Sequence, residues 1–183
     1  MKAALSTTPR GVKTLDELRS LLHTKIRKEA VGFSLLPSGI PKGAITSISG
    51  VGKTEFVLQL LSEQPDLKVA WIEDSFSIFP FGFVQRKIKL DRILFVDAGK
   101  DLFWATLEAL RSQTFTVVVF YGETSDLSLL RRVQLETEKS NAMTLWLSPE
   151  PPALWPVSLQ LQVQKRRNGL INSLEVQILK SKQ

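Results

Sequence analysis

A glycine-rich turn between an apolar run and a helical pattern constrains this chain more than any other feature. The turn spans residues 50–54 (G-V-G-K-T), after the apolar run 44–48 and before the helix-like run 55–61. A strand, a glycine turn, Lys-Thr and a helix in this order are typical of a phosphate-binding loop, in which backbone N–H groups hold the phosphates. Its lysine contacts the terminal phosphates, and its threonine hydroxyl binds Mg²⁺. The sequence therefore predicts a site for ATP and Mg²⁺, with Thr54 as the metal ligand and four cofactor-binding residues: Gly50, Gly52, Lys53 and Thr54.

The turn is shorter than the full pattern of a phosphate loop. That pattern places four residues between its first glycine and Gly-Lys-Thr. Counting back from Gly52, the first-glycine position holds Ser47; if Gly50 is the first glycine, only Val51 separates it from Gly52. A short loop surrounds less of a phosphate group. The sequence thus leaves two readings open, a working nucleotide site and a degenerate one.

The composition excludes several other kinds of site. The chain has 183 residues, the length of one domain with a real core, and it contains no cysteine and a single histidine, His23. Disulfides, thiolate metal sites and cysteine nucleophiles are excluded, and a histidine-rich metal site is not expected. No apolar run approaches the roughly 18 residues that span a bilayer, and residues 1–13 lack the apolar region of a secretory signal. We therefore expect a cytoplasmic protein that does not contact a membrane.

Strand-like and helix-like segments alternate through the middle of the chain. This alternation predicts an α/β fold with a mainly parallel sheet flanked by helices. Two alternating runs near the C-terminus, with the turn Asn168-Gly169 between them, predict an antiparallel hairpin. The segment 32–43 is rich in glycine and proline and is expected to be a connector. The expected strands are 44–48, 68–73, 93–97, 116–120, 143–147, 159–164 and 174–179, and the expected helices are 53–63, 101–112 and 127–140.

A capped helix is expected near the N-terminus. Thr14 and Glu17 form a capping box, after which apolar residues recur at helical spacing. We expect residues 1–34 to form a leader and helix that serve as a docking element, and residues 35–183 to form the core domain. The apolar positions of this helix are Leu15, Leu18, Leu22 and Ile26.

Four phenylalanines surround Pro80. The expected arrangement packs most of these side chains beneath the sheet, and the alternative is an exposed surface that docks a partner. The four residues are Phe76, Phe79, Phe81 and Phe83.

Several motifs in one order resemble the RecA-type ATPase core. Residues 39–44 (G-I-P-K-G-A) resemble the segment that leads into the phosphate loop of that family, and residues 71–74 (W-I-E-D) resemble its second strand. Residues 130–135 (L-R-R-V-Q-L) and 165–169 (K-R-R-N-G) are similar to the bacterial ImuA/SulA branch, in which an L-R-R-L-Q-L helix and a K-R-R-x-G turn flank a late strand. The resemblance covers about residues 35–180 and implies a RecA-like core with a C-terminal antiparallel hairpin.

The resemblance also assigns the positions of the active site. Lys53 and Thr54 match the lysine that contacts phosphate and the residue that binds Mg²⁺. The water-orienting glutamate of the family falls near Ser75; Glu73 or Asp74 could replace it only if the strand end shifted, and strand alternation places those two on opposite faces.

Two further positions of the family also lack their usual residues. The acid that supports Mg²⁺ is replaced by Tyr121, and the sensor of the γ-phosphate falls on Ser148 or Pro149. Phosphoryl transfer depends on positioning and charge neutralisation. We therefore assign no catalytic residue and expect a degenerate site that hydrolyses ATP poorly or not at all.

The resemblance implies an accessory protein of the DNA-damage (SOS) response and translesion mutagenesis, closest to ImuA. Its expected partners are a translesion polymerase complex or a RecA-like protein, and the N-terminal helix would support self-association. The loops 121–126 and 148–156 carry no Lys or Arg, so any DNA contact would use the basic N-terminal helix, Arg131-Arg132 or residues 165–167. The net charge of +6 is compatible with DNA and equally with a solvated surface. The alternatives are a SulA-like inhibitor of cell division and an active RecA-type, DNA-dependent ATPase.

Overall fold

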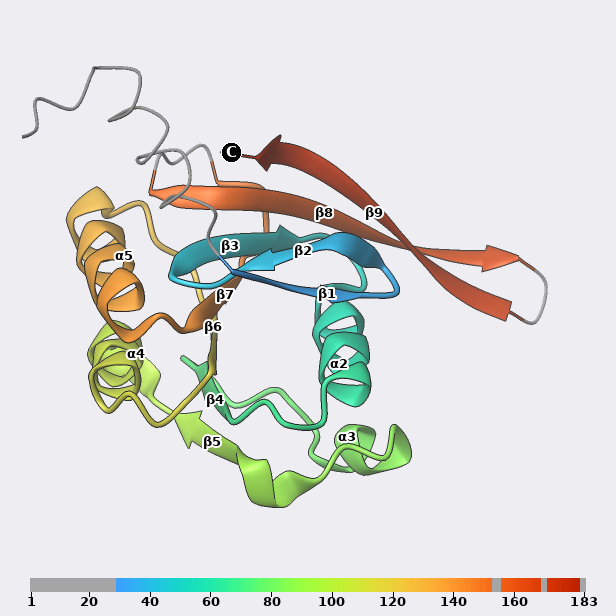
Figure 1. Ribbon diagram of the computed structural model, residues 1–183, viewed down its shortest axis with the longest axis horizontal. Coiled ribbons are helices and arrows are strands. Elements are labelled where there is room, and N and C mark those ends of the chain that lie inside the picture. The colour runs from blue at the N-terminus through green and yellow to red at the C-terminus, as the bar shows by residue number, and fades with distance from the viewer. Residues whose placement is uncertain (1–28, 153–155, 169–170, 182–183) are drawn as a thin grey trace, which may run out of the picture.

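A seven-stranded sheet forms the centre of the computed structural model, which describes residues 29–152, 156–168 and 171–181 (Figure 1). Its strand order is β5-β4-β6-β7-β3-β8-β9, and β1 and β2 form a separate two-stranded sheet. The strands are β1 (Ala30–Phe33), β2 (Leu36–Pro41), β3 (Ala44–Ser49), β4 (Val69–Glu73), β5 (Ile93–Asp97), β6 (Val117–Tyr121), β7 (Met143–Leu147), β8 (Val157–Asn168) and β9 (Ile171–Ser181). The helices are α2 (Lys53–Glu63), α3 (Phe81–Gln85), α4 (Leu102–Arg111) and α5 (Leu127–Ser140), with 3₁₀ turns η1 (Leu90–Arg92) and η2 (Gly99–Asp101).

The predicted fold class is confirmed. Every pairing from β5 to β8 is parallel, and β8 pairs with β9 in the antiparallel sense. The strand β6 shows why a parallel arrangement forms: Val117 to Phe120 are completely buried, so this run of β-branched and aromatic residues needs cover on both faces. The phosphate-loop strand, β3, lies inside the sheet between β7 and β8.

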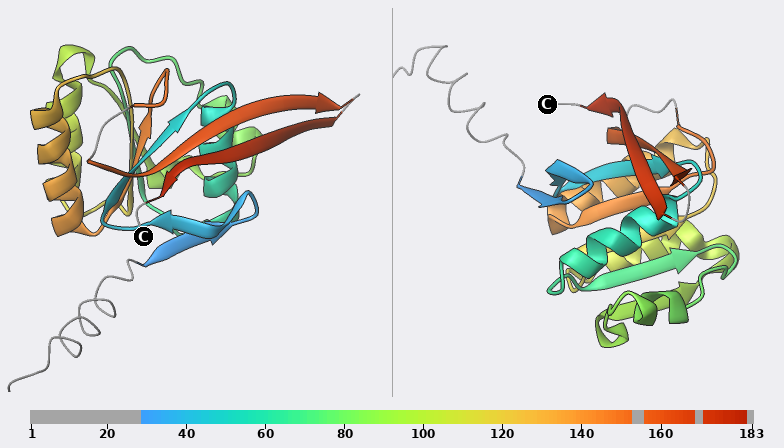
Figure 2. Two further views of the ribbon diagram at one scale, coloured as in Figure 1. Left: turned by 90° about the horizontal axis from the view of Figure 1, so that it is seen from above. Right: turned by 90° about the vertical axis from the view of Figure 1, so that its right-hand side faces the viewer.

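Helices cover both faces of the sheet. Helix α2 lies on one face together with the β1–β2 hairpin, and α4 and α5 lie on the other (Figures 1 and 2). Each face has its own hydrophobic core: Leu60 of α2 belongs to one cluster, and Leu107 of α4 and Val133 of α5 belong to the other. Alternate residues of β6 feed the two clusters, Val119 the first and Phe120 the second.

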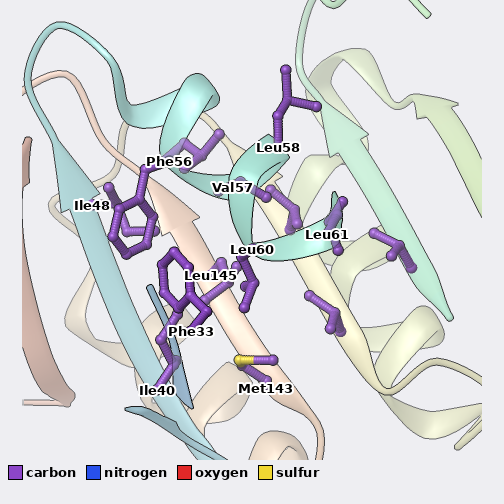
Figure 3. Close-up of a cluster of buried hydrophobic side chains, with 14 of the residues drawn as sticks. Phe33, Ile40, Ile48, Phe56, Val57, Leu58, Leu60, Leu61, Met143 and Leu145 are labelled. Carbon is purple, nitrogen blue, oxygen red and sulfur yellow. The ribbon is translucent and has the colours of Figure 1, made fainter. Parts of the chain in front are cut away.

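The segment expected to be a connector is a β-hairpin, so that expectation was wrong. Leu36 and Ile40 of β2 are buried, and Phe33 of β1 meets the Phe56 ring of α2 edge-on at 4.9 Å between centroids (Figure 3). Glycine and proline at alternate positions hid the strand pattern: Gly39 has φ +82°, and its missing side chain lets the two strands approach closely. The expected boundary after residue 34 falls within this hairpin, whereas the expected N-terminal helix and His23 lie outside the described residues.

The phenylalanine cluster divides between core and surface. Phe83 is fully buried and lies 5.5 Å from the Trp71 ring centroid, beneath β4. The other three side chains are exposed: 42% for Phe76, 73% for Phe79 and 54% for Phe81. The expectation that most of them pack beneath the sheet was therefore wrong, because Phe76 and Phe79 precede α3 and this five-residue helix turns only Phe83 inward. No helix among the described residues is both long and apolar enough to span a bilayer.

Candidate nucleotide site

The glycine turn is a short loop, as its sequence predicts. Strand β3 continues to Ser49 and α2 begins at Lys53, which leaves only Gly50, Val51 and Gly52 between them. Ser47, at the first-glycine position of the full pattern, lies within β3 and pairs with Trp146 and Gln160. The residues that would widen a full phosphate loop are therefore part of the sheet.

The β8–β9 hairpin packs against this loop. Gly50 has φ +91°, and a Cβ atom there would lie 2.4 Å from the carbonyl oxygen of Val163 in β8. Gly52 has φ +114°, and its Cβ would lie 2.9 Å from a methyl group of Leu174 in β9. The positive φ favours glycine at both positions, and at Gly50 the backbone of the hairpin also leaves no room for a side chain.

The N-terminus of α2 faces the loop without a side-chain cap. Gly52 is the N-cap residue, and the Phe56 N–H donates to its carbonyl at 2.9 Å. The partial positive charge of a helix N-terminus and its free N–H groups favour an anion. Glu55 is the acidic residue of this first turn, but its carboxylate accepts hydrogen bonds from the guanidinium of Arg86 and so is neutralised locally.

Lys53 turns towards the ends of two parallel strands. Its Nζ atom lies 4.9 Å from the centre of the Tyr121 ring, at the end of β6, and donates to the carbonyl oxygen of Ser148, just after β7, at 3.3 Å. Burial lowers the pKa of the Lys53 amino group. Neither the Tyr121 ring nor the Ser148 carbonyl carries a negative charge, so neither balances the charge of the Lys53 ammonium group.

Both carboxylate oxygens of Glu73 accept hydrogen bonds from neighbouring residues. Its carboxylate accepts from the Trp71 Nε1–H at 2.8 Å, from the Ser77 backbone N–H and hydroxyl, and from the Ile78 N–H at 3.2 Å. The side chain is 2% exposed. Asp74 and Ser75 are both exposed in the segment that follows β4.

Ser148 is the residue at the sensor position that lies inside the site. It is 2% exposed, its N–H donates to the Ile48 carbonyl at 3.0 Å, and its carbonyl accepts from Lys53. Its hydroxyl is buried without a hydrogen-bond partner in the described part of the chain. This hydroxyl is therefore available to a further hydrogen-bond partner, and Ser148 also lines a cavity between the loops that follow β6 and β7.

Thr54 lies half-buried in the first turn of α2. Nothing in the described ranges groups three or more His, Cys, Asp or Glu side chains in a way that could hold a metal ion. The role of Thr54 as a Mg²⁺ ligand stays a prediction, as do the cofactor contacts of Gly50, Gly52 and Lys53.

Sequence reasoning missed the position of Lys165 relative to the loop. Its Cβ lies 3.8 Å from the point that a Cβ of Gly52 would occupy. No local pattern signals this approach, because β8 reaches the loop only by pairing with β3. The side chain borders a cavity of about 380 Å³ between the hairpin and α2, whose other lining residues are Leu35, Glu55, Gln59, Arg86, Ser173 and Leu174.

The loops that follow β6 and β7 line a second cavity, of about 660 Å³. Glu123 and Glu150 are among its lining residues, and none of the residues described there is a lysine or arginine. Phosphate contacts need Lys or Arg, so the absence of DNA binding by these loops stays a prediction. Of the basic clusters, Arg131 and Arg132 are exposed on α5.

Comparisons with known proteins find a structural neighbour but no family. No family model matches the chain, and no curated protein matches it. Among solved structures, the flagellar accessory protein FlaH from Methanocaldococcus jannaschii is similar to it, with a TM-score of 0.54 and 15% identity over 78% of this chain and 80% of that chain. An identity this low shows the fold alone. Together with the mainly parallel sheet and its C-terminal hairpin, the likeness shows that the chain has a RecA-like core.

Proposed function

We propose that this chain is a RecA-like accessory protein that acts by binding a protein partner and does not hydrolyse ATP, although it keeps a degenerate nucleotide site. The observation that carries the proposal is the carboxylate of Glu73, which is buried and fully engaged by Trp71, Ser77 and Ile78. An acid held in this way cannot orient an attacking water. Tyr121 stands where the acid that supports the metal is expected, so charge neutralisation is weakened as well.

The engaged carboxylate has a second consequence, which supports partner binding. Through Ser77 and Ile78 it fixes the segment that presents an exposed apolar patch beside β5. Arg86 fixes the other end of that segment, because it binds Glu55 and donates to the Gly82 carbonyl at 3.0 Å. We call the patch the aromatic surface; its residues are Phe76, Phe79, Phe81 and Val84, between 42% and 73% exposed.

An exposed aromatic cluster on a fixed segment is typical of a protein interface. Phe79 and Phe81 lie 6.1 Å apart between ring centroids, and Phe76 meets the Phe95 ring edge-on at the same distance. The rings are thus held against one another before any partner arrives. Preorganisation of this kind lowers the entropy lost on binding.

The biological setting of the proposal is the DNA-damage response with translesion mutagenesis. It is supported by the resemblance of residues 130–135, which the structure places on α5, and of residues 165–168, at the end of β8, to the ImuA/SulA branch. The proposed partner is a translesion polymerase complex or a RecA-like protein, with self-association and DNA contact at Arg131-Arg132 as additional interactions.

The experiment combines a hydrolysis assay with binding to purified candidate partners. We expect no ATP hydrolysis above background with Mg²⁺ and single-stranded DNA, and binding to a translesion polymerase complex or RecA that Phe79→Ser and Phe81→Ser weaken about tenfold or more. Trp104→Ser is the matched control, because Trp104 is 63% exposed on α4, on the other face of the sheet. Hydrolysis that Lys53→Ala abolishes would contradict the proposal, as would partner binding that is equally affected by all three serine variants. Binding to a cell-division protein instead would favour the SulA-like alternative.

A further inference from the structure

We infer that the loop binds a phosphate group without a divalent cation, and that Lys53 and Lys165 supply the positive charge. The inference rests on the proposed function, which keeps a nucleotide site but removes hydrolysis. It departs from the expectation that Thr54 holds Mg²⁺, because the residues around the loop do not fit that ion.

The site lacks free carboxylates that could bind Mg²⁺. Mg²⁺ is bound in nucleotide sites by one or two carboxylates, water and substrate phosphates. At the end of β6 the ring of Tyr121 takes the place of such a carboxylate and faces Lys53 instead. The carboxylate of Glu73 is engaged by four donors and is buried. In the part of the chain that the structure describes, no cluster of metal-binding side chains compensates.

Among the residues assigned to this site, a metal ion would therefore have one protein ligand, the hydroxyl of Thr54, and no carboxylate. Lys53 interacts only with an aromatic face and a carbonyl oxygen, neither of which carries a full negative charge. A phosphate anion can balance the charge of this lysine directly.

Three features of the loop fit a bare anion. The N-terminus of α2 has no side-chain cap, so its N–H groups face the loop. Lys53 keeps its charge unbalanced, as described above. The hydroxyl of Ser148 is buried without a partner, although both main-chain groups of that residue are hydrogen-bonded, one of them to Lys53.

Lys165 adds the second positive charge. It belongs to β8, which packs against the loop at Gly50 and Gly52, and its side chain is exposed. Within the described ranges it forms no ion pair, and the acid that shares its cavity, Glu55, is neutralised by Arg86. A lysine has a flexible four-carbon stem, which lets its ammonium reach a phosphate at the loop.

The test is calorimetry with pyrophosphate and with ATP, each in EDTA and in excess Mg²⁺. We expect both ligands to bind in EDTA. Adding Mg²⁺ should either change the affinity by less than about threefold or weaken the binding. Lys53→Met and Lys165→Met should each weaken binding about tenfold or more, since each removes a charge-assisted contact with the phosphate. Lys100→Met is the control, because Lys100 is exposed in η2 after β5 and should leave the affinity unchanged.

A restored acid provides the converse test. Tyr121→Asp returns a carboxylate to the end of β6, and we expect this variant to bind ATP at least tenfold more tightly with Mg²⁺ than in EDTA. Circular dichroism melting confirms that each variant is folded. Wild-type binding that needs Mg²⁺, or the absence of binding at millimolar pyrophosphate, overturns the inference. Neither result contradicts the proposed binding of a protein partner. Hydrolysis of ATP by the wild type overturns the proposed function instead.

Discussion

Lys53 places its Nζ atom 4.9 Å from the centre of the Tyr121 ring, so a cation lies over an aromatic face where two parallel strands end. In this arrangement the lysine of the glycine loop also joins α2 to the sheet, through the ring of β6 and the Ser148 carbonyl that follows β7. Lys53, which identifies the loop in the sequence, therefore also stabilises the packing of α2 against the sheet. Its titration can be used to measure how far its amino group is buried in this arrangement.

The first prediction concerns pH. Burial lowers the pKa of Lys53 below the ordinary value of 10.5, so between the lowered pKa and 10.5 the unfolded chain binds more protons at this position than the folded protein. The contribution of Lys53 to the free energy of unfolding must then rise with pH in that window. We expect wild type to gain stability relative to Lys53→Met as the pH approaches 10.5, because methionine keeps the apolar stem and does not titrate.

Urea unfolding of both proteins over a series of pH values provides the measurement. The difference between the two free energies of unfolding should be constant below the window and should shift in favour of the wild type within it. Lys68→Met, at an exposed lysine before β4, is the control for general alkaline effects. Parallel profiles for wild type and Lys53→Met would contradict the structural account of this lysine.

The second prediction concerns Glu73. Replacement by alanine leaves the Trp71 Nε1–H and the N–H groups of Ser77 and Ile78 without their acceptor. We expect Glu73→Ala to lower the free energy of unfolding by about 2–3 kcal/mol, because buried donors that lose a charged acceptor are expensive. Asp74→Ala changes an exposed neighbour and should stay within about 0.5 kcal/mol of the wild type in the same urea titration. Equal, small effects of both substitutions would mean that Glu73 does not hold the segment.

Most of the parallel sheet could be predicted because its signals are local. The strands β3 to β7 and the helices α2, α4 and α5 were expected within one or two residues of where they lie, since each is a continuous apolar run or an amphipathic period. The short helix α3 was not expected. The β1–β2 hairpin was missed because Gly39 and Pro37 are typical of turns in the sequence, while the structure uses the glycine for a close strand crossing.

The site was predictable only in part, for a different reason. The short loop follows from counting residues before Lys53, and the loss of the metal-supporting acid follows from Tyr121. The approach of Lys165 to Gly52 depends on the pairing of β8 with β3, between segments far apart in the chain. Phe76 and Phe79 lie in the irregular segment before α3, and Phe81 lies on the outer side of this short helix, an arrangement that composition does not determine.

The third prediction concerns the end of α2. The guanidinium of Arg92 donates to the carbonyls of Gln64 at 2.7 Å and Leu67 at 3.0 Å, and also to that of Leu61. The carbonyls of Leu61 and Gln64 belong to the last turn and the cap of α2, where a helix leaves acceptors unpaired, and that of Leu67 lies in the segment before β4. We expect Arg92→Ala to lower the free energy of unfolding by about 2–3 kcal/mol, and Arg92→Lys to recover less than half of the loss, because an ammonium cannot donate in a fork.

Urea unfolding measures both substitutions at Arg92. Arg111→Ala is the matched control, because Arg111 is about half exposed and pairs with Glu108 on the same surface helix. An exposed ion pair of this kind contributes about 0–1 kcal/mol. If Arg92→Lys is as stable as the wild type, charge alone explains the contact, and the role of Arg92 as a cap is wrong.

The fourth prediction concerns the contact between the loop and the hairpin. An added Cβ at Gly50 would meet the Val163 carbonyl oxygen at 2.4 Å, and the backbone there has φ +91°. The close contact cannot be relieved by rotating a side chain, because the obstacle is the backbone of β8. The unfavourable φ angle remains as well. We expect Gly50→Ala to lower the free energy of unfolding by about 3 kcal/mol or more, or to displace the hairpin from the loop.

Gly82→Ala provides the comparison that isolates this contact. Gly82 lies in α3, has no atom within 4 Å of an added Cβ, and has no positive φ. Alanine in a helix is favoured over glycine by up to about 1 kcal/mol, so this variant should match or exceed the stability of the wild type. Hydrogen exchange at Val163 and Gln164 separates the two outcomes for Gly50→Ala: faster exchange confined to these amides indicates a displaced hairpin, and uniformly faster exchange indicates loss of global stability. A Gly50→Ala protein as stable as Gly82→Ala, with unchanged exchange in β8, would show that the hairpin does not pack against the loop.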